Sequence, residues 1–137
     1  MTTLPDVEIS TDPARLDIDL IHRHLSASYW AAGRSRAVVE RTIQHSLCFG
    51  AYLGAQQVGF GRVITDYATF AYLADIIVFD GCQGRGVGKA IVKAMVEHPQ
   101  IGGIRLMLLR TRDAHGLYEK FGFGAIPQPN EMMVRYS

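Results

Sequence analysis

The chain has 137 residues, of which 48% are hydrophobic and 20% are charged, an ordinary composition for one soluble globular domain. Lys and Arg number 14 against 13 Asp and Glu, and this net charge of +1 argues against a general nucleic-acid binder. Cys48 and Cys82 form no CxxC pair, which argues against a disulfide scaffold or a cysteine-based zinc site. Without a leader-like start or a bilayer-length apolar run, we expect a cytoplasmic protein that does not bind membranes.

The first half of the chain predicts helices before a change to strand periodicity. Asp12 followed by Pro13 is a helix-start signal, and Ser35 is a good helix cap. In chain order we expect a strand at 7–10, a helix from Pro13 to about Leu25, a loop over 26–35, a helix over 36–47 and a hairpin that turns at Ala55–Gln56.

The second half alternates strands and helices. "FAYLADIIVF" (70–79) is apolar on both faces except at Asp75, which is typical of a central strand. We expect this strand to be followed by a helix at 86–98, a strand at 104–111, a helix at 113–121 closed by a left-handed Gly122, and a last strand at 131–137. The whole order predicts a single α/β (α+β) domain, residues 1–137, in which helices pack around a mixed sheet.

The segment "FDGCQGRGVG" (79–88) places four glycines at the junction of a predicted strand and helix. Glycines let a ligand approach the backbone, and the unpaired N–H groups of a helix start favour an anion. Arg85 and Lys89 add positive charge beside them. The alternative is a sharp turn whose glycines serve helix–sheet packing, and the loop alone leaves both interpretations open.

Two common phosphate-binding motifs do not fit this loop. A P-loop needs Ser or Thr after Gly88–Lys89, where Ala90 stands, and a glycine where Gln83 stands. A dinucleotide fingerprint needs a small residue at the position of Lys89 or Ile91. The sequence therefore argues against a dinucleotide or nucleotide-phosphate binder.

The remaining pattern, Q-x-x-G-x-G at 83–88, resembles the acyl-CoA-binding motif of the GNAT family of N-acetyltransferases. A second mark of that family, A-x-x-L-Y-x-x-x-G-F, matches residues 114–123. The resemblance implies a mixed, mostly antiparallel central sheet with helices on both faces. It also implies an enzyme that moves an acetyl group from acetyl-CoA to a primary amine by direct attack, without a metal. The alternative is a non-catalytic acyl-CoA-binding sensor on the same fold.

The resemblance also assigns a binding site for the co-substrate acetyl-CoA. In the family the pantetheine chain pairs with the strand before the loop, and the pyrophosphate lies on the loop. The residues expected to bind it are Ile76, Ile77, Val78, Gln83, Gly84, Arg85, Gly86, Val87, Gly88 and Lys89.

Two residues are candidates for the chemistry. Tyr118 occupies the family's general-acid position; the alternative is a core tyrosine, because Leu117 and Phe121 share its helix face. Asp75 is the only charge in its strand, and burial there is expected to raise its pKa, which suits a base. A structural aspartate is the alternative. The family's usual Glu on this strand aligns with Tyr72, so no base carries over directly, and a water relay to Asp75 or the absence of a dedicated base are both open.

The acceptor is expected to be a small-molecule or peptide amine, recognised by the variable N-terminal half and by the entry to the strand at 70–79. Aromatic rings with an acid would suit an amine cation, although the same rings could be core. A homodimer is compatible with the sequence. The candidate acceptor residues are Tyr29, Trp30, Asp66, Tyr67, Phe70 and Tyr72.

Overall fold

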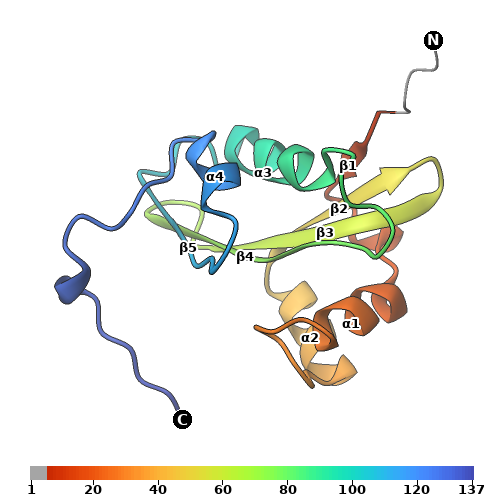
Figure 1. Ribbon diagram of the computed structural model, residues 1–137, viewed down its shortest axis with the longest axis horizontal. Coiled ribbons are helices and arrows are strands. Elements are labelled where there is room, and N and C mark those ends of the chain that lie inside the picture. Colours follow the sequence, from red (N-terminus) through yellow and green to blue (C-terminus); the bar gives the residue numbers. More distant parts are fainter. Residues whose placement is uncertain (1–5) are drawn as a thin grey trace.

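A computed structural model describes residues 6–137. Five strands form one sheet in the order β1-β2-β3-β4-β5 (Figure 1). Neighbouring strands are antiparallel except β4 and β5, which are parallel and joined through a helix. This is the mixed, mostly antiparallel sheet that the sequence predicts. The strands are β1 Glu8–Ser10, β2 Leu47–Leu53, β3 Gln56–Thr65, β4 Phe70–Val78 and β5 Leu106–Leu109.

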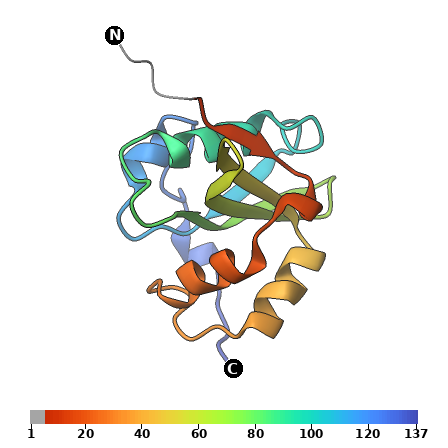
Figure 2. The same cartoon turned by 90° about the vertical axis from the view of Figure 1, so that its right-hand side faces the viewer.

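Helices cover both faces of the sheet, as expected. One face carries α3 (Val87–Glu97) and α4 (His115–Glu119), and the other carries α1 (Ile18–Ser26) and α2 (Arg36–Gln44) (Figures 1 and 2). The larger core cluster lies between the sheet and α3, and the second lies between the sheet and α1 and α2. None of the helices within residues 6–137 combines the length and apolarity needed to cross a membrane.

The single helix expected from Pro13 to about Leu25 is wrong in its first turn. The chain forms a 3-10 helix at Pro13–Arg15, becomes extended at Leu16 and starts α1 only at Ile18. A second cap explains the break, because the Asp17 side chain accepts a hydrogen bond from the Leu20 N–H. The cap expected at Ser35 is confirmed by its hydrogen bond from the Val38 N–H.

The last strand expected at 131–137 is also wrong. Residues 124–137, here called the C-terminal arm, lead away from the domain and contain only a 3-10 helix at Pro129–Glu131 (Figure 1). Elsewhere the expected elements are present but shorter. The strand expected at 104–111 is β5, and the helix expected at 113–121 is α4. Gly122 has the expected left-handed conformation, with φ of 89°.

Two glycines on β3 allow α3 to approach the sheet closely. A Cβ atom on Gly59 would lie 2.8 Å from Val87 Cγ1, and one on Gly61 would lie 2.6 Å from Met95 Cε. Real Cβ atoms do not approach so near. Gly59 also lies against the Ile77 carbonyl oxygen, so a side chain there would push α3 away, whereas at Gly61 the flexible end of Met95 would have to move. The close contact at Val87 fixes the first turn of α3 beside the end of β4.

Candidate active site

The site begins at a β-bulge in β4. Phe60 pairs with Ile77 and Arg62 pairs with Ala74, so Gly61 faces two residues, Asp75 and Ile76. Asp75 has a left-handed backbone, with φ of 55°. The extra residue changes the side-chain alternation, because Leu73 packs in the core under α3 whereas Asp75 turns to the face of α1 and α2.

The bulge coincides with the point where β4 and β5 separate. Their parallel pairing ends at Leu73 and Leu109, while β4 continues to Val78 paired with β3. The Phe79 N–H bonds to the Val58 carbonyl, so by the alternation of an antiparallel ladder the backbone groups of Ile76 and Val78 point away from β3. Apart from the Val78 carbonyl oxygen, which lies 3.4 Å from the Gln83 amide nitrogen, these groups form an open edge to which an extended amide chain can bind as an added strand.

Asp75 is buried and accepts three charged or polar hydrogen bonds. Arg34 Nη1 donates to Oδ2 at 2.7 Å, Arg62 Nε donates to Oδ2 at 2.8 Å, and Trp30 Nε1 donates to Oδ1 at 2.9 Å. The Asp75 side chain is 3% exposed, and those of Arg34 and Arg62 are 21% and 11% exposed. Two guanidinium groups around one carboxylate leave the cluster with a net positive charge.

The expected rise in the pKa of Asp75 is wrong. Burial does favour the neutral acid, but the hydrogen bonds and charges of Arg62 and Arg34 outweigh it and hold the pKa below the ordinary value. The sequence could not reveal these partners, because Arg62 is 13 positions away on β3 and Arg34 lies 41 positions away in a loop. A carboxylate with a lowered pKa and three donors is poorly suited to take a proton.

The glycine loop opens α3 with a left-handed cap. Gly86 is the N-cap residue with φ of 76°, and Gly84 has φ of 80°. The first turn of α3 carries no acidic residue, and the first intrahelical bond runs from the Ala90 N–H to the Gly86 carbonyl. The N–H groups of the preceding turn are therefore unpaired within the helix and, with Arg85 and Lys89 exposed beside them, favour an anion.

Gln83 has a local role in holding this loop. Its side-chain oxygen accepts a hydrogen bond from the Gly81 N–H, and its amide nitrogen lies 3.4 Å from the Val78 carbonyl oxygen. The side chain thus links the end of β4 to the turn before α3. Its expected role in cofactor binding stays a prediction.

Tyr118 lies on α4, on the face of the sheet that also carries α3 (Figure 1). The residue is 9% exposed, and its ring packs edge-on against Phe123. Burial raises the pKa of the phenol, and the negative forms of Tyr29 and Asp113 raise it further. Tyr118 is therefore protonated at neutral pH and able to donate a proton.

The loop over 26–35 joins the two walls of the site. Trp30 and Arg34 reach Asp75 on β4, and the guanidinium of Arg112 stacks over the Tyr29 ring at 3.7 Å in the segment before α4. Tyr29 and Trp30 also contact each other edge-on. The structure thus brings these two expected acceptor residues to the region between Asp75 and Tyr118.

The other expected acceptor residues lie toward the far end of β4. Phe70 is five residues before Asp75, about 16 Å along an extended strand. Asp66 does not offer a free carboxylate, since it accepts bonds from the turn residues Ala68, Thr69 and Phe70, which lower its pKa. Tyr67 is exposed in the same turn, and Tyr72 is half-buried near the start of β4. The lowered pKa keeps the Asp66 carboxylate ionised, and its role in acceptor binding stays a prediction.

The described residues 6–137 hold no group of three or more His, Cys, Asp or Glu side chains placed to bind a metal ion. Two surface hollows, of about 570 and 230 Å³, lie beside α1 and the β2–β3 turn. The smaller one extends toward the glycine loop as far as Phe79, Asp80 and Cys82. Neither hollow is lined by Ile76 or Val78 at the open edge of β4. Burial raises the pKa of the Cys48 thiol to about 11, so this residue is not a thiolate nucleophile.

Comparison with known proteins identifies the family. The sequence model of the family described as "Acetyltransferase (GNAT) domain" matches residues 44–124. A candidate acetyltransferase of the fungus Gibberella zeae is 31% identical, in an alignment that covers 86% of this chain and 78% of the relative. The chain therefore belongs to the GNAT acetyltransferases, an acyl-transfer family, as the two sequence motifs indicate.

Solved structures agree with this assignment. A crystal structure of a candidate GNAT acetyltransferase from Xanthomonas campestris has a TM-score of 0.94 and 48% identity, with 98% of this chain and 96% of that chain covered. A candidate acetyltransferase from Deinococcus radiodurans, 17% identical over 98% and 92% of the two chains, shares the fold with a TM-score of 0.75.

The first prediction concerns the stability that Asp75 contributes. In Asp75→Asn the two guanidinium groups lose their buried counter-charge, and we expect unfolding to become easier by about 3–5 kcal/mol at neutral pH. Because the folded pKa lies below the unfolded value of about 3.9, the wild-type advantage should be constant above about pH 5 and shrink as the pH falls through the folded pKa. Denaturant unfolding at several pH values measures this, and Asp6→Asn, at an exposed site, is the control. A pH-independent difference would contradict the ion-pair account.

Proposed function

We propose that this protein transfers the acetyl group of acetyl-CoA to the primary amine of a small molecule or peptide. The observation that carries the proposal is the alignment of two features: the open edge of β4 at Ile76 and Val78 leads directly to the uncapped N–H groups of α3. An extended amide chain that ends in a pyrophosphate fits this combination, because the chain pairs with the strand and the anion meets the helix start.

The acyl end of such a ligand would lie near the bulge, between β4 and α4. In the proposed reaction the amine nitrogen forms a bond to the acetyl carbon while the carbon–sulfur bond breaks. Tyr118 is assigned to donate a proton to the departing sulfur, since its raised pKa keeps the phenol protonated and thiols ionise near pH 8.5. Backbone N–H groups at the open edge are suited to stabilise the developing oxyanion.

The charge around the bulge suggests the class of acceptor. Arg34 and Arg62 surround the Asp75 carboxylate, and a third guanidinium, that of Arg112, stacks on the Tyr29 ring. The Asp66 carboxylate is hydrogen-bonded within its own turn. A net positive pocket rimmed by Tyr29 and Trp30 suits an amine that also carries a carboxylate or phosphate group. We therefore propose an acidic amine as the acceptor.

The same charge assists deprotonation of the acceptor without a dedicated base. Near pH 7 only about one alkylamine in 10³–10⁴ is neutral in water. Neighbouring guanidinium groups disfavour the ammonium form and so lower its pKa, which increases the reactive fraction. We assign Asp75 to hold Arg34, Arg62 and Trp30 in position, and the acceptor proton passes to water.

The cofactor site can be tested at Gly86 with a matched control at Gly54. Both glycines have left-handed backbones, with φ of 76° and 61°, and no atom lies near the position of an added Cβ. Valine should therefore strain both turns alike, but only Gly86→Val places a side chain over the proposed pyrophosphate site. Calorimetric titration should give at least about tenfold weaker CoA binding for Gly86→Val than for Gly54→Val. Equal affinities would rule out this loop as the pyrophosphate site.

Removing the proposed acid tests catalysis separately from binding. Tyr118→Phe should lower turnover by about 10²–10⁴ while CoA affinity stays near the wild-type value, because the hydroxyl acts only as the sulfur departs. Free CoA release gives the rate, and thermal melting shows whether the ring still packs on Phe123. If the variant were less stable but turned over at the normal rate, Tyr118 would have only a structural role in the core. A wild-type chain that binds acetyl-CoA but releases no CoA with any amine would favour the sensor alternative.

The acceptor class is tested with paired amines that differ only in an acidic group, such as an amino acid and its amide. We expect kcat/KM to be at least about tenfold higher for the acidic member, and Arg112→Gln to reduce that ratio while leaving CoA affinity unchanged. If neutral and acidic amines react equally well, the proposal of an acidic acceptor is wrong, whereas the proposal of acetyl transfer to an amine is supported.

A further inference from the structure

His24 joins helix α1 to the turn that precedes the glycine loop. Its ring stacks on the Phe79 ring, with centroids 4.3 Å apart, and its side chain is only 9% exposed. Both ring nitrogens have backbone partners: Nδ1 lies 2.8 Å from the Leu20 carbonyl oxygen, and Nε2 lies 3.1 Å from the Asp80 nitrogen. The second contact spans 56 positions of the chain, so nothing in the local sequence indicates it.

These two contacts determine where the ring carries its hydrogen. A carbonyl oxygen can only accept, so Nδ1 must donate to Leu20, and a backbone N–H can only donate, so Nε2 must accept from Asp80. The contacts therefore hold His24 as the neutral Nδ1–H tautomer. A second proton, on Nε2, would face the Asp80 N–H and break this hydrogen bond.

The bond from Asp80 completes the hydrogen bonding of the turn at 79–82. All four of its N–H groups have acceptors, which are in chain order the Val58 carbonyl, His24 Nε2, the Gln83 side-chain oxygen and the Phe79 carbonyl. In contrast, the N–H groups of residues 83–86 have no acceptor within residues 6–137. The turn that His24 anchors thus ends where the unpaired donors of the glycine loop begin.

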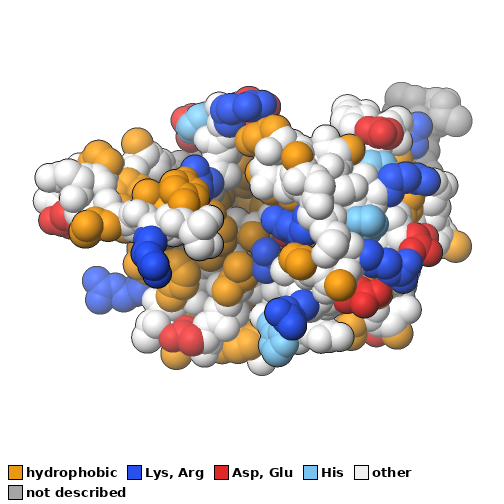
Figure 3. Space-filling model, turned by 90° about the horizontal axis from the view of Figure 1, so that it is seen from below, with side chains coloured by type: hydrophobic (Ala, Val, Ile, Leu, Met, Phe, Trp, Pro, Cys, Tyr) orange, Lys and Arg blue, Asp and Glu red, His pale blue; other side chains and the backbone are white. Residues whose placement is uncertain are grey.

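Two charged side chains and one thiol share the surroundings of the ring. The Asp80 carboxylate oxygen Oδ2 lies 3.9 Å from Nε2, and Arg23 and Cys82 line the same small hollow, to which β3 brings uncharged side chains. Figure 3 looks onto the side of the domain with α1 and α2, where acidic and basic side chains are mixed. The Asp80 carboxylate can accept from a protonated Nε2, which would replace the backbone bond by a side-chain bond.

We propose that His24 is a positioning residue for CoA binding. Its neutral ring holds the turn at 79–82, so that the N–H groups of residues 83–86 are arranged for the pyrophosphate before it binds. This inference rests on the proposed function, because it concerns the same loop. Protonation of the ring releases the turn, and CoA affinity then falls with pH, because only the fraction of the protein with an ordered loop binds well.

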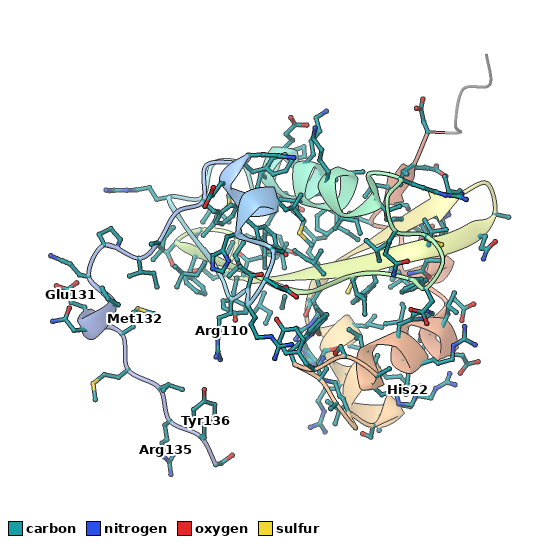
Figure 4. The ribbon with its side chains drawn as sticks, in the orientation of Figure 1. His22, Arg110, Glu131, Met132, Arg135 and Tyr136 are labelled. Carbon is teal, nitrogen blue, oxygen red and sulfur yellow. The ribbon has the colours of Figure 1, made fainter. Side chains whose placement is uncertain are left out.

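Three variants separate the hydrogen bond from the packing of the ring. His24→Phe keeps a ring on Phe79 but leaves the Asp80 N–H without this acceptor, and calorimetric titration at about pH 8 should give CoA binding about five- to tenfold weaker. His24→Gln should restore binding to within about twofold of wild type, since its amide oxygen can accept in place of Nε2. His22→Phe is the matched control. His22 lies on the same helix (Figure 4) and has a ring contact with the Arg34 carbonyl, so its loss should lower thermal stability without changing CoA affinity.

The pH dependence gives a second readout. The phosphates of CoA also change charge between about pH 8 and about pH 5.5, so wild type is compared with His24→Gln, in which residue 24 no longer titrates. The ratio of the wild-type dissociation constant to that of the variant should rise by at least about threefold as the pH falls over this range. Without any ligand, nitrogen-15 spectra of the ring at about pH 8 should show hydrogen on Nδ1 and none on Nε2.

The outcomes distinguish this inference from the function on which it rests. A wild-type chain that binds no CoA would refute both. CoA binding that is equally strong in wild type and His24→Phe, a constant ratio across the pH range, or a ring with hydrogen on Nε2 would refute the positioning role alone. Equally weakened binding in His24→Phe and His22→Phe would refute it as well, because the loss would then follow stability and not the loop.

Discussion

The bulge at Asp75 is the constraint on which the site depends. A left-handed backbone costs a non-glycine residue about 1–2 kcal/mol, and aspartate tolerates it better than most. Here the hydrogen bonds from Arg34, Arg62 and Trp30 hold the residue in that conformation. The extra residue turns β4 away from β5 immediately after their last pair, Leu73 and Leu109, and so creates the open edge.

Two of these three contacts attach the N-terminal part of the chain to β4. Trp30 and Arg34 belong to the loop between α1 and α2, which has no regular structure of its own. Their bonds to Asp75 fix this loop over β4, and the stacking of Arg112 on Tyr29 fixes its other end by α4. The Asp75 carboxylate therefore holds this loop against β4. The hydrogen bonds and charges of Arg62 and Arg34 outweigh its burial and lower its pKa, whereas a base would need a raised pKa.

The proposed anion-binding end of the site is positioned by helix packing and not by charge. Gly59 and Gly61 let α3 lie close on β3, and this contact sets the first turn of the helix at the exit of β4. The left-handed Gly86 then starts the helix without a side-chain cap, so its N–H groups stay available. Open strand edge and helix start are thus adjacent for separate physical reasons, the bulge in one case and close helix packing in the other.

The sequence by itself determined the features that depend on neighbours in the chain. Periodicity and caps predicted the α/β order, and the spacing of Gln83 to Gly88 and of Ala114 to Phe123 identified the family. Tertiary structure decided what depends on distant partners. Asp75 changed from a presumed base to the centre of an ion-pair cluster because Arg34 and Arg62 approach from other elements, and an alternating pattern at 131–137 formed no strand because a strand exists only where an edge is within reach.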